Sequence, residues 1–195
     1  MNDMKYTMSV IMSVYNDEKN VDNAIKSILN QSYKNFEFLI IDDCSVDSTF
    51  KKIEKFKDLD KRVKIFKNSK NIGLTKSLNL LLHNSSTELI ARQDSDDFSL
   101  PTRLEEQVDL LKSKKYDAVY TRAINKQNKA KIPGLSFYLP HRLSIKYKNP
   151  YIHGSLMIKY DVLKSLNYYS EDFYYAQDYK LAWDLHKKNY KVGVK

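Results

Sequence analysis

The chain has 195 residues, 42% of them hydrophobic and 12% aromatic, which is enough for one substantial core or a core with a smaller lobe. A single cysteine, Cys44, excludes an internal disulfide framework, and no apolar run approaches the length of a membrane span. The formal net charge is +9, but the lysines are scattered rather than gathered in a stripe, so we expect no nucleic acid as a partner. No signal-peptide pattern opens the chain, and we expect a cytoplasmic protein.

Strand and helix patterns alternate through the first half of the chain. The apolar run Met8–Val14 predicts a buried strand, and apolar positions at helical spacing predict a helix over Val21–Leu29, with Asn20 as its cap. Further strands are expected over 36–41, 62–66 and 88–92, and further helices after Ser48, over 74–82 and after Pro101. Short connections between alternating strands and helices indicate an α/β fold: an open, mostly parallel sheet with helices on both faces.

The second half is less regular. A strand is expected over 117–120, whereas residues 121–150 are polar and contain prolines, which favours a loop or hairpin excursion over the sheet. Regular structure resumes at 151–158, followed by a short helix opened by Asp161 and an amphipathic helix over 177–188. Alternation over 190–194 is typical of a strand that is just beginning.

Negative charge gathers where the strand at 88–92 ends, because Asp94, Asp96 and Asp97 follow it directly in "ARQDSDDFSLPTRLEEQ". Carboxylates this close repel one another unless a cation lies among them, and ligands made only of oxygen select Mg²⁺ or Mn²⁺. A calcium loop of the EF-hand type is excluded, since Ser99 stands where its glycine belongs. Asp94 or Asp97 as the cap of a turn before the next helix is the alternative.

Other polar residues are expected at the same edge of the sheet. Ser13 and Tyr15 end the first strand, and Asp43 follows the strand at 36–41. Ligands of open α/β sheets bind beyond the carboxyl ends of the strands, and hard cations commonly bind substrate phosphates. The pattern therefore indicates a site for a diphosphate. A dinucleotide-dependent oxidoreductase is disfavoured, because no G-x-G-x-x-G follows the first strand and the chain has four glycines.

Five segments occur in one order and spacing that resemble a known family. They are "MSVIMSVYNDEKNVDNAIKSILNQSYKNFEFLIIDDCSVDST", "NIGLTKSLN", "ARQDSDDFSLPTRLEEQ", "YIHGSLMI" and "YYAQDYKLAWDL". Together they resemble the family 2 inverting glycosyltransferases of bacterial type, which have the Rossmann-like GT-A fold, over residues 8 to 190. The resemblance implies a nucleotide-sugar-binding half at 1–100 and an acceptor-side half of the same domain at 101–195, without the family's usual C-terminal extension.

On the donor side, the resemblance implies that Ser13 and Tyr15 border the nucleotide base and that Asp43 accepts a hydrogen bond from a uracil-type edge. A carboxylate at a strand end suits an N–H donor. Lys76 is either a diphosphate or base-side contact or an ordinary surface lysine of its helix.

At the reacting end, the resemblance implies that Asp96 lies by the ribose and the metal and that Asp97 is a direct metal ligand. Asp178 matches the catalytic base, although Gln177 stands where the family usually has a glutamate. The alternative for an aspartate that begins a helix is an N-terminal cap. His153 resembles a histidine that faces the site, or is a buried structural side chain.

The implied activity is transfer of a sugar, with inversion, from a nucleotide diphosphate donor, a UDP-sugar, to a hydroxyl of a saccharide or a lipid-linked saccharide, in the presence of Mg²⁺ or Mn²⁺. The alternative is a nucleotide-binding protein with little or no transferase activity, because its acceptor side is incomplete. Peripheral contact with the inner face of the membrane and homo-oligomerisation are left open.

Overall fold

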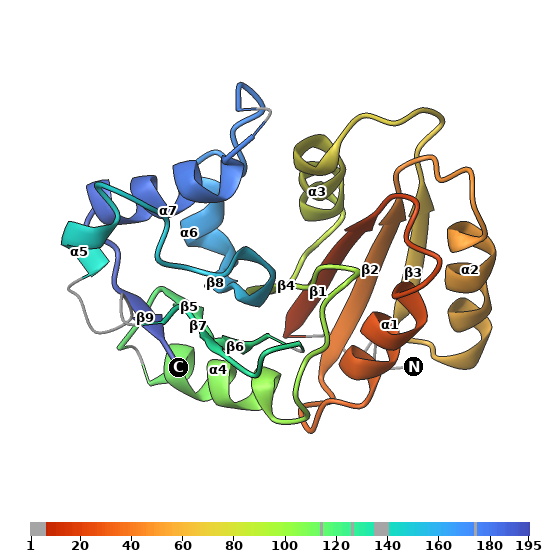
Figure 1. The fold of residues 1–195 in the computed structure, drawn as a ribbon, viewed down its shortest axis with the longest axis horizontal. Helices are drawn as coiled ribbons and strands as arrows, with labels where there is room; N and C mark the ends of the chain where they lie inside the picture. The colour runs from red at the N-terminus through yellow and green to blue at the C-terminus, as the bar shows by residue number, and fades with distance from the viewer. Residues whose placement is uncertain (1–6, 114, 126, 135–140, 174) are drawn as a thin grey trace.

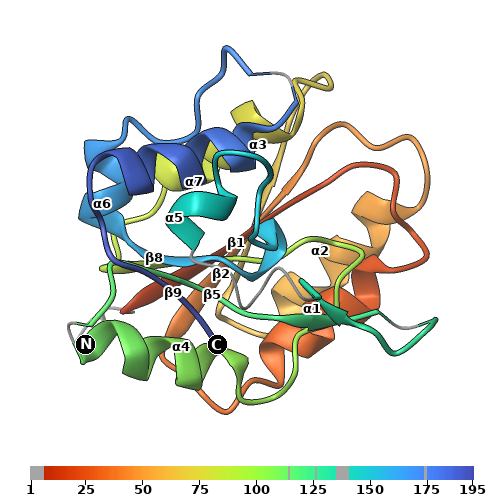
Figure 2. The same ribbon diagram turned by 60° about the vertical axis from the view of Figure 1, so that its left-hand side comes forward.

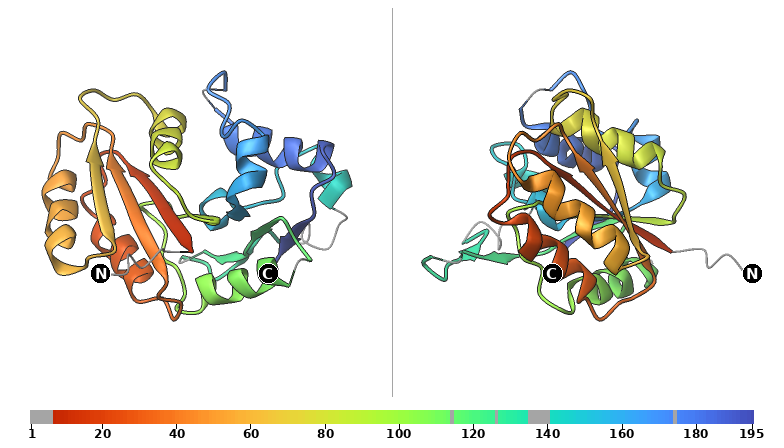
Figure 3. Two further views of the ribbon diagram at one scale, coloured as in Figure 1. Left: turned by 180° about the vertical axis from the view of Figure 1, so that it is seen from behind. Right: turned by 90° about the vertical axis from the view of Figure 1, so that its right-hand side faces the viewer.

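The structure is a computed structural model that describes residues 7–113, 115–125, 127–134, 141–173 and 175–195. A seven-stranded sheet with the order β3-β2-β1-β4-β8-β5-β9 runs through the molecule (Figure 1). Its strands are β1 Met8–Val14, β2 Phe36–Asp42, β3 Val63–Lys67, β4 Leu89–Arg92, β5 Ala118–Tyr120, β8 Met157–Lys159 and β9 Val192–Val194. Seen from behind, β3 and β9 lie at opposite ends of the sheet (Figure 3).

The sheet is mostly parallel, as predicted. Met8 of β1 stands opposite Phe36 of β2 and Leu89 of β4, so the three strands run side by side in one direction. β3 is parallel to β2, and β9 is parallel to β5. β8 runs antiparallel to both of its neighbours, β4 and β5. The carboxyl ends of β1, β2 and β4 therefore meet at one edge, which is where ligands bind in such sheets.

Helices cover both faces of the sheet, because each one buries an apolar stripe against it (Figure 2). One face carries α1 Val21–Leu29, α2 Thr49–Leu59 and α4 Arg103–Lys112. The other carries α3 Leu74–His83, α6 Tyr160–Ser165 and α7 Gln177–Lys187. The remaining elements are the hairpin β6 Ala123–Ile124 and β7 Lys131–Ile132, the short helix α5 His141–Ser144 and the 3-10 helix η2 His153–Ser155.

Asn20 and Ser48 stand at the N-cap positions of α1 and α2, as predicted, but neither side chain makes a capping hydrogen bond. The Nδ2 of Asn20 donates to Asp17 Oδ1. α6 begins at Tyr160 rather than Asp161, since β8 leads straight into it. The hairpin expected within 121–150 is present as β6 and β7, although residues 126 and 135–140 of that segment lie outside the described residues.

Within the described part of the chain, none of the helices is both long and apolar enough to cross a membrane.

Candidate nucleotide-binding and catalytic site

A pocket of about 400 Å³ opens at the carboxyl ends of β1 and β4. It is lined by Ser13, Tyr15, Asn16, Asp17, Asn20, Leu74, Arg92, Asp94, Ser95 and Asp96. Three residues predicted for the donor side, Ser13, Tyr15 and Asp96, thus share one pocket. The parallel register of β1 and β4 brings them together, because it sets Ile11 opposite Arg92, so that β1 continues to Val14 in the direction in which the acidic segment follows β4.

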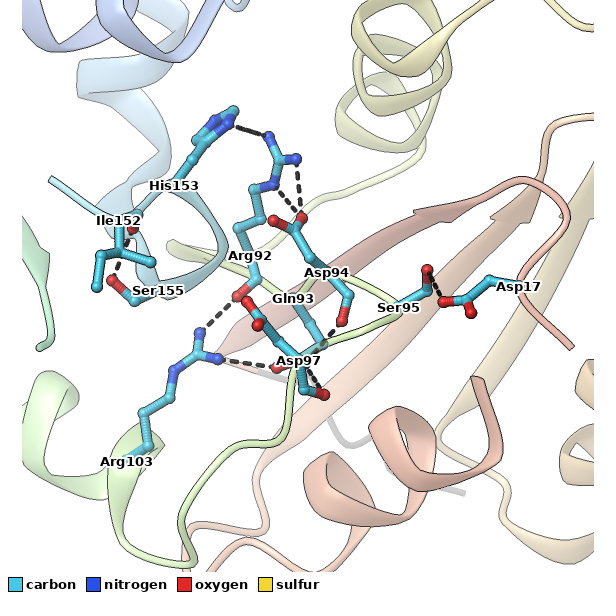
Figure 4. A network of polar contacts seen from close by, with 10 residues as sticks. All are labelled: Asp17, Arg92, Gln93, Asp94, Ser95, Asp97, Arg103, Ile152, His153 and Ser155. Atoms are coloured by element: carbon cyan, nitrogen blue, oxygen red, sulfur yellow. Dashed lines mark hydrogen bonds and ion pairs between the residues drawn. The ribbon is translucent and has the colours of Figure 1, made fainter. Parts of the chain in front are cut away.

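Asp17, which the sequence analysis did not single out, joins three segments around this pocket. Its Oδ2 accepts a hydrogen bond from Ser95 Oγ at 2.7 Å, and its Oδ1 accepts one from Asn20 Nδ2, also at 2.7 Å. Its backbone N–H donates to Thr49 Oγ1 at the start of α2. Asp17 therefore fixes the acidic segment after β4 against the β1–α1 loop (Figure 4).

Arg92, at the end of β4, is 2% exposed and pairs with Asp94. Its Nε and Nη2 each lie 2.8 Å from Asp94 Oδ1, and its Nη1 lies 2.6 Å from Nε2 of His153 (Figure 4). Burial opposes the charge of Arg92, but the Asp94 carboxylate raises its pKa above the usual value. Burial and the nearby Arg92 charge hold the pKa of His153 well below its usual range, so the neutral ring accepts from the guanidinium.

Asp94 and Asp97 converge on Gly154 of η2. A Cβ added there would lie 2.7 Å from Asp97 Oδ2 and 2.8 Å from Asp94 Oδ2, so the two carboxylates occupy space that only glycine leaves free. Across the ranges that the structure describes, no three His, Cys, Asp or Glu side chains form a group that encloses an ion. Two converging carboxylates, with Asp96 exposed nearby, fit a hard cation that takes its other ligands from a substrate phosphate.

Arg103 of α4 holds the acidic segment from below and was also missed. Its guanidinium donates to Gln93 Oε1 at 2.9 Å and to the carbonyl oxygen of Arg92 at 2.5 Å (Figure 4). It also donates to Ser99 Oγ at 2.7 Å. Burial lowers the pKa of Arg103 to about 10, while the charges of Asp94 and Asp97 act in the opposite direction. No periodic signal marks it, because a charged residue beside the apolar positions of a helix usually faces solvent.

Asp43 is not among the residues that line the pocket. It is 2% exposed, its Oδ1 accepts from Asn68 Nδ2 at 2.8 Å and from Ile72 N at 2.9 Å, and its Oδ2 accepts from Gly73 N at 2.8 Å. Gly73 has φ +86, a left-handed conformation that favours glycine, directly before Leu74 of α3. Asp43 thus sets the start of α3, and its contact with a base remains a prediction.

Lys76 is exposed in the first turn of α3 and is not among the residues that line the pocket. The structure therefore does not bring it together with Ser13, Tyr15 and Asp96.

Asp178 lies in the first turn of α7, where Ala176 rather than Asp178 is the N-cap residue and no side chain caps the helix. Its Oδ2 accepts a hydrogen bond from Asn149 Nδ2 at 2.7 Å. Burial raises the pKa of Tyr169, whose ring also senses the charges of Arg92, Asp94 and Asp178. The Tyr169 ring lies edge-on to His153, with centroids 5.3 Å apart. Its hydroxyl is buried beside Arg92 without a hydrogen bond of good geometry.

A doubly wound sheet with an acidic pocket at the ends of its central strands defines the class of α/β proteins that bind ligands beyond the carboxyl ends of the strands. Residues 9–169 match the family model described as Glycosyl transferase family 2, and the chain belongs to this family.

Curated relatives include bacterial glycosyltransferases. The chain is 33% identical over 165 residues to the putative glycosyltransferase EpsE of Bacillus subtilis, covering 83% of this chain and 59% of EpsE. It is 37% identical over 182 residues to the O-antigen biosynthesis glycosyltransferase WbnJ of Escherichia coli, covering 89% and 69%. It is 32% identical over 186 residues to the Escherichia coli UDP-Glc:alpha-D-GlcNAc-diphosphoundecaprenol beta-1,3-glucosyltransferase WfgD, covering 94% and 71%.

Solved structures share the fold. S. aureus TarS 1-349 in complex with UDP superimposes with a TM-score of 0.79 at 23% identity, covering 96% of this chain and 57% of that one. The mannosyltransferase PcManGT from Pyrobaculum calidifontis, in complex with GDP-Man and Mn²⁺, superimposes with a TM-score of 0.79 at 20% identity, covering 97% of this chain and 54% of that one. The chain has the GT-A fold.

Proposed function

We propose that this glycosyltransferase moves a sugar from a UDP-sugar to a hydroxyl of a saccharide or a lipid-linked saccharide, with inversion at the anomeric carbon. The observation that carries the proposal is the convergence of Asp94 and Asp97 on Gly154, beside a pocket lined by Ser13, Tyr15 and Asp96. The UDP in the TarS complex and the UDP-Glc in the name of WfgD support the choice of nucleotide.

We assign Asp96 and Asp97 as the side chains that would hold Mg²⁺ or Mn²⁺, and PcManGT was solved with Mn²⁺. A divalent ion held there would neutralise the negative charge of the departing diphosphate. Asp94 faces the same space, but its Oδ1 is paired with Arg92, so its share in binding the ion is smaller. Ser13 and Tyr15 would border the base, and Lys76 would act only from the pocket's margin.

Asp178 is the proposed general base. As the acceptor hydroxyl attacks the anomeric carbon, a carboxylate oxygen of Asp178 takes its proton, and a single displacement inverts that centre. Holding acceptor, donor and base in line lowers the barrier by several kcal/mol, since the reaction becomes effectively unimolecular. A cytoplasmic site of action, where nucleotide sugars and lipid-linked acceptors meet at the membrane, follows from this proposal.

Ligand-dependent stabilisation tests the class of donor. The thermal midpoint should rise with UDP plus Mn²⁺ and much less with GDP plus Mn²⁺, and NAD or an oligonucleotide should leave it unchanged. A rise with GDP alone would replace the uridine assignment, and a rise with NAD or with the oligonucleotide would overturn the proposal. A panel of nucleotide sugars, scored by UDP release, then identifies the sugar.

A further inference from the structure

Asn149 makes two hydrogen bonds that fix its side-chain amide in one orientation. Its Nδ2 donates to Asp178 Oδ2 at 2.7 Å, and its Oδ1 accepts from the backbone N–H of Tyr151 at 3.1 Å. A carboxylate only accepts and a backbone N–H only donates, so the opposite orientation of the amide would break both bonds. The amide is thus held between the chain that carries it and the first turn of α7.

Tyr151 anchors the segment that presents Asn149. Its ring stacks on Tyr120 of β5 with centroids 4.3 Å apart and on His186 of α7 with centroids 5.9 Å apart. Its hydroxyl lies 2.6 Å from Nε2 of His186. A second hydrogen bond connects α7 with the segment before Asn149, because the Tyr179 hydroxyl donates to the carbonyl oxygen of Ile145. The position of Asn149 relative to α7 is therefore set by packing and not by its contact with Asp178 alone.

We propose that Asn149 is a positioning residue for the general base: it fixes Oδ2 of Asp178 and leaves Oδ1 as the oxygen that receives the acceptor's proton. This inference rests on the proposed function, in which Asp178 is the base.

Asn149→Asp is the matched variant for this inference. Its Oδ1 still accepts from Tyr151, so the turn is kept, but the donor to Asp178 is lost and a like charge takes its place. Asn149→Ala removes both bonds.

Nuclear magnetic resonance of the Asn149 side-chain amide reports directly on its contact with Asp178. The chemical shift of this amide should differ between the wild type and Asp178→Asn, because the substitution removes the carboxylate that accepts its hydrogen bond. An amide signal at the same position in both proteins would overturn the proposal.

Release of UDP from the nucleotide sugar found in the panel reads the functional role. Asn149→Ala should lower the rate about tenfold, the usual worth of a hydrogen bond to a charged group, and Asn149→Asp should lower it further. In the Asp178→Asn background neither change should lower it again, because Asn149 acts through Asp178. Equal further losses in that background would show a merely structural role. An Asp178→Asn protein that releases UDP at the wild-type rate would instead refute the base itself, while the amide signal still decides the contact.

Discussion

The proposed nucleotide side and the proposed acceptor side of the site are built in different ways. Around the pocket, loops from successive parallel strands bind one another: the backbone N–H of Asn16 donates to Ser45, the Asn16 side chain accepts from Val46, and Asp17 accepts from Ser95. On the acceptor side, the Asp178 carboxylate is held by one amide from a segment between short elements. The proposed nucleotide side is thus preformed by hydrogen bonds between loops at the ends of parallel strands, whereas the proposed acceptor side depends on packing between α7 and the segment that carries Asn149.

We expect Asp178→Asn to have the largest effect of these substitutions. It distinguishes the two sides of the site, because it should change the transfer rate and not the affinity for UDP. Loss of a positioned base should lower transfer roughly 10²- to 10⁴-fold while the affinity for UDP with Mn²⁺ stays nearly unchanged. Rates from UDP release and affinities from calorimetry check this. A parallel loss of UDP affinity or of the folded state would show that Asp178 serves donor binding or stability instead.

The two sides touch at Gly154, and Gly154→Ala tests that contact. The added Cβ would lie 2.7 Å from Asp97 Oδ2 and 2.8 Å from Asp94 Oδ2, so the carboxylates must move apart. We expect affinity for UDP with Mn²⁺ to fall about tenfold, as for changes in groups that orient metal ligands. Gly134→Ala is the matched control, because a Cβ there meets nothing within 4 Å. Equal calorimetric affinities for the two variants would contradict a role for the contact between Gly154 and the two carboxylates in binding UDP with Mn²⁺.

His153 makes the stability of the folded protein sensitive to acid. Its pKa in the folded protein lies well below the usual value of about 6.5, because burial and Arg92 oppose its charge. The unfolded chain therefore binds more protons below pH 6.5, and stability falls as the pH drops, by up to about 1.4 kcal/mol per pH unit from this group. His153→Gln should flatten that acid side of the stability curve in denaturant titrations. A wild-type curve of the same slope as the variant's would contradict the assignment.

Lys76→Ala is the smallest expected effect. Lys76 is exposed and outside the pocket lining, so UDP affinity with Mn²⁺ should change less than about threefold, as is usual for exposed charges. A larger loss, measured by the same calorimetry, would show that α3 moves toward the diphosphate on binding.

The two sides of the site also differ in how well the sequence predicts them. Met8–Val14 and the other apolar runs indicate parallel strands, and parallel strands bring Ser13 and Tyr15 to the edge where Asp96 and Asp97 emerge. These predictions follow from the local sequence pattern and from the geometry of parallel sheets. The GT-A resemblance extends it to the whole fold, which the structural neighbours confirm.

The contacts that complete the site leave no such pattern. Gly154 meets Asp97 from 57 positions along the chain, and Asn149 meets Asp178 across a segment without clear periodicity. Arg103 is buried beside apolar positions where a solvent-facing charge is the ordinary expectation. Only tertiary packing decides these pairings, and side-chain spacing does not encode them. Asn20 and Ser48 stand at the predicted N-cap positions, but the orientation of their side chains, which decides whether a capping bond forms, is likewise not encoded by spacing.

Calorimetry of UDP with Mn²⁺ on the wild type, Asp97→Asn and the control Asp109→Asn tests the central claim most directly. Asp109 is an exposed carboxylate of α4, so its loss matches the change of charge without touching the site. We predict wild-type affinity for Asp109→Asn, and for Asp97→Asn a loss of more than roughly 100-fold, beyond that caused by changes around metal ligands. Equal Mn²⁺-dependent affinity in all three proteins would contradict the assignment of Asp97 as a ligand of the cation.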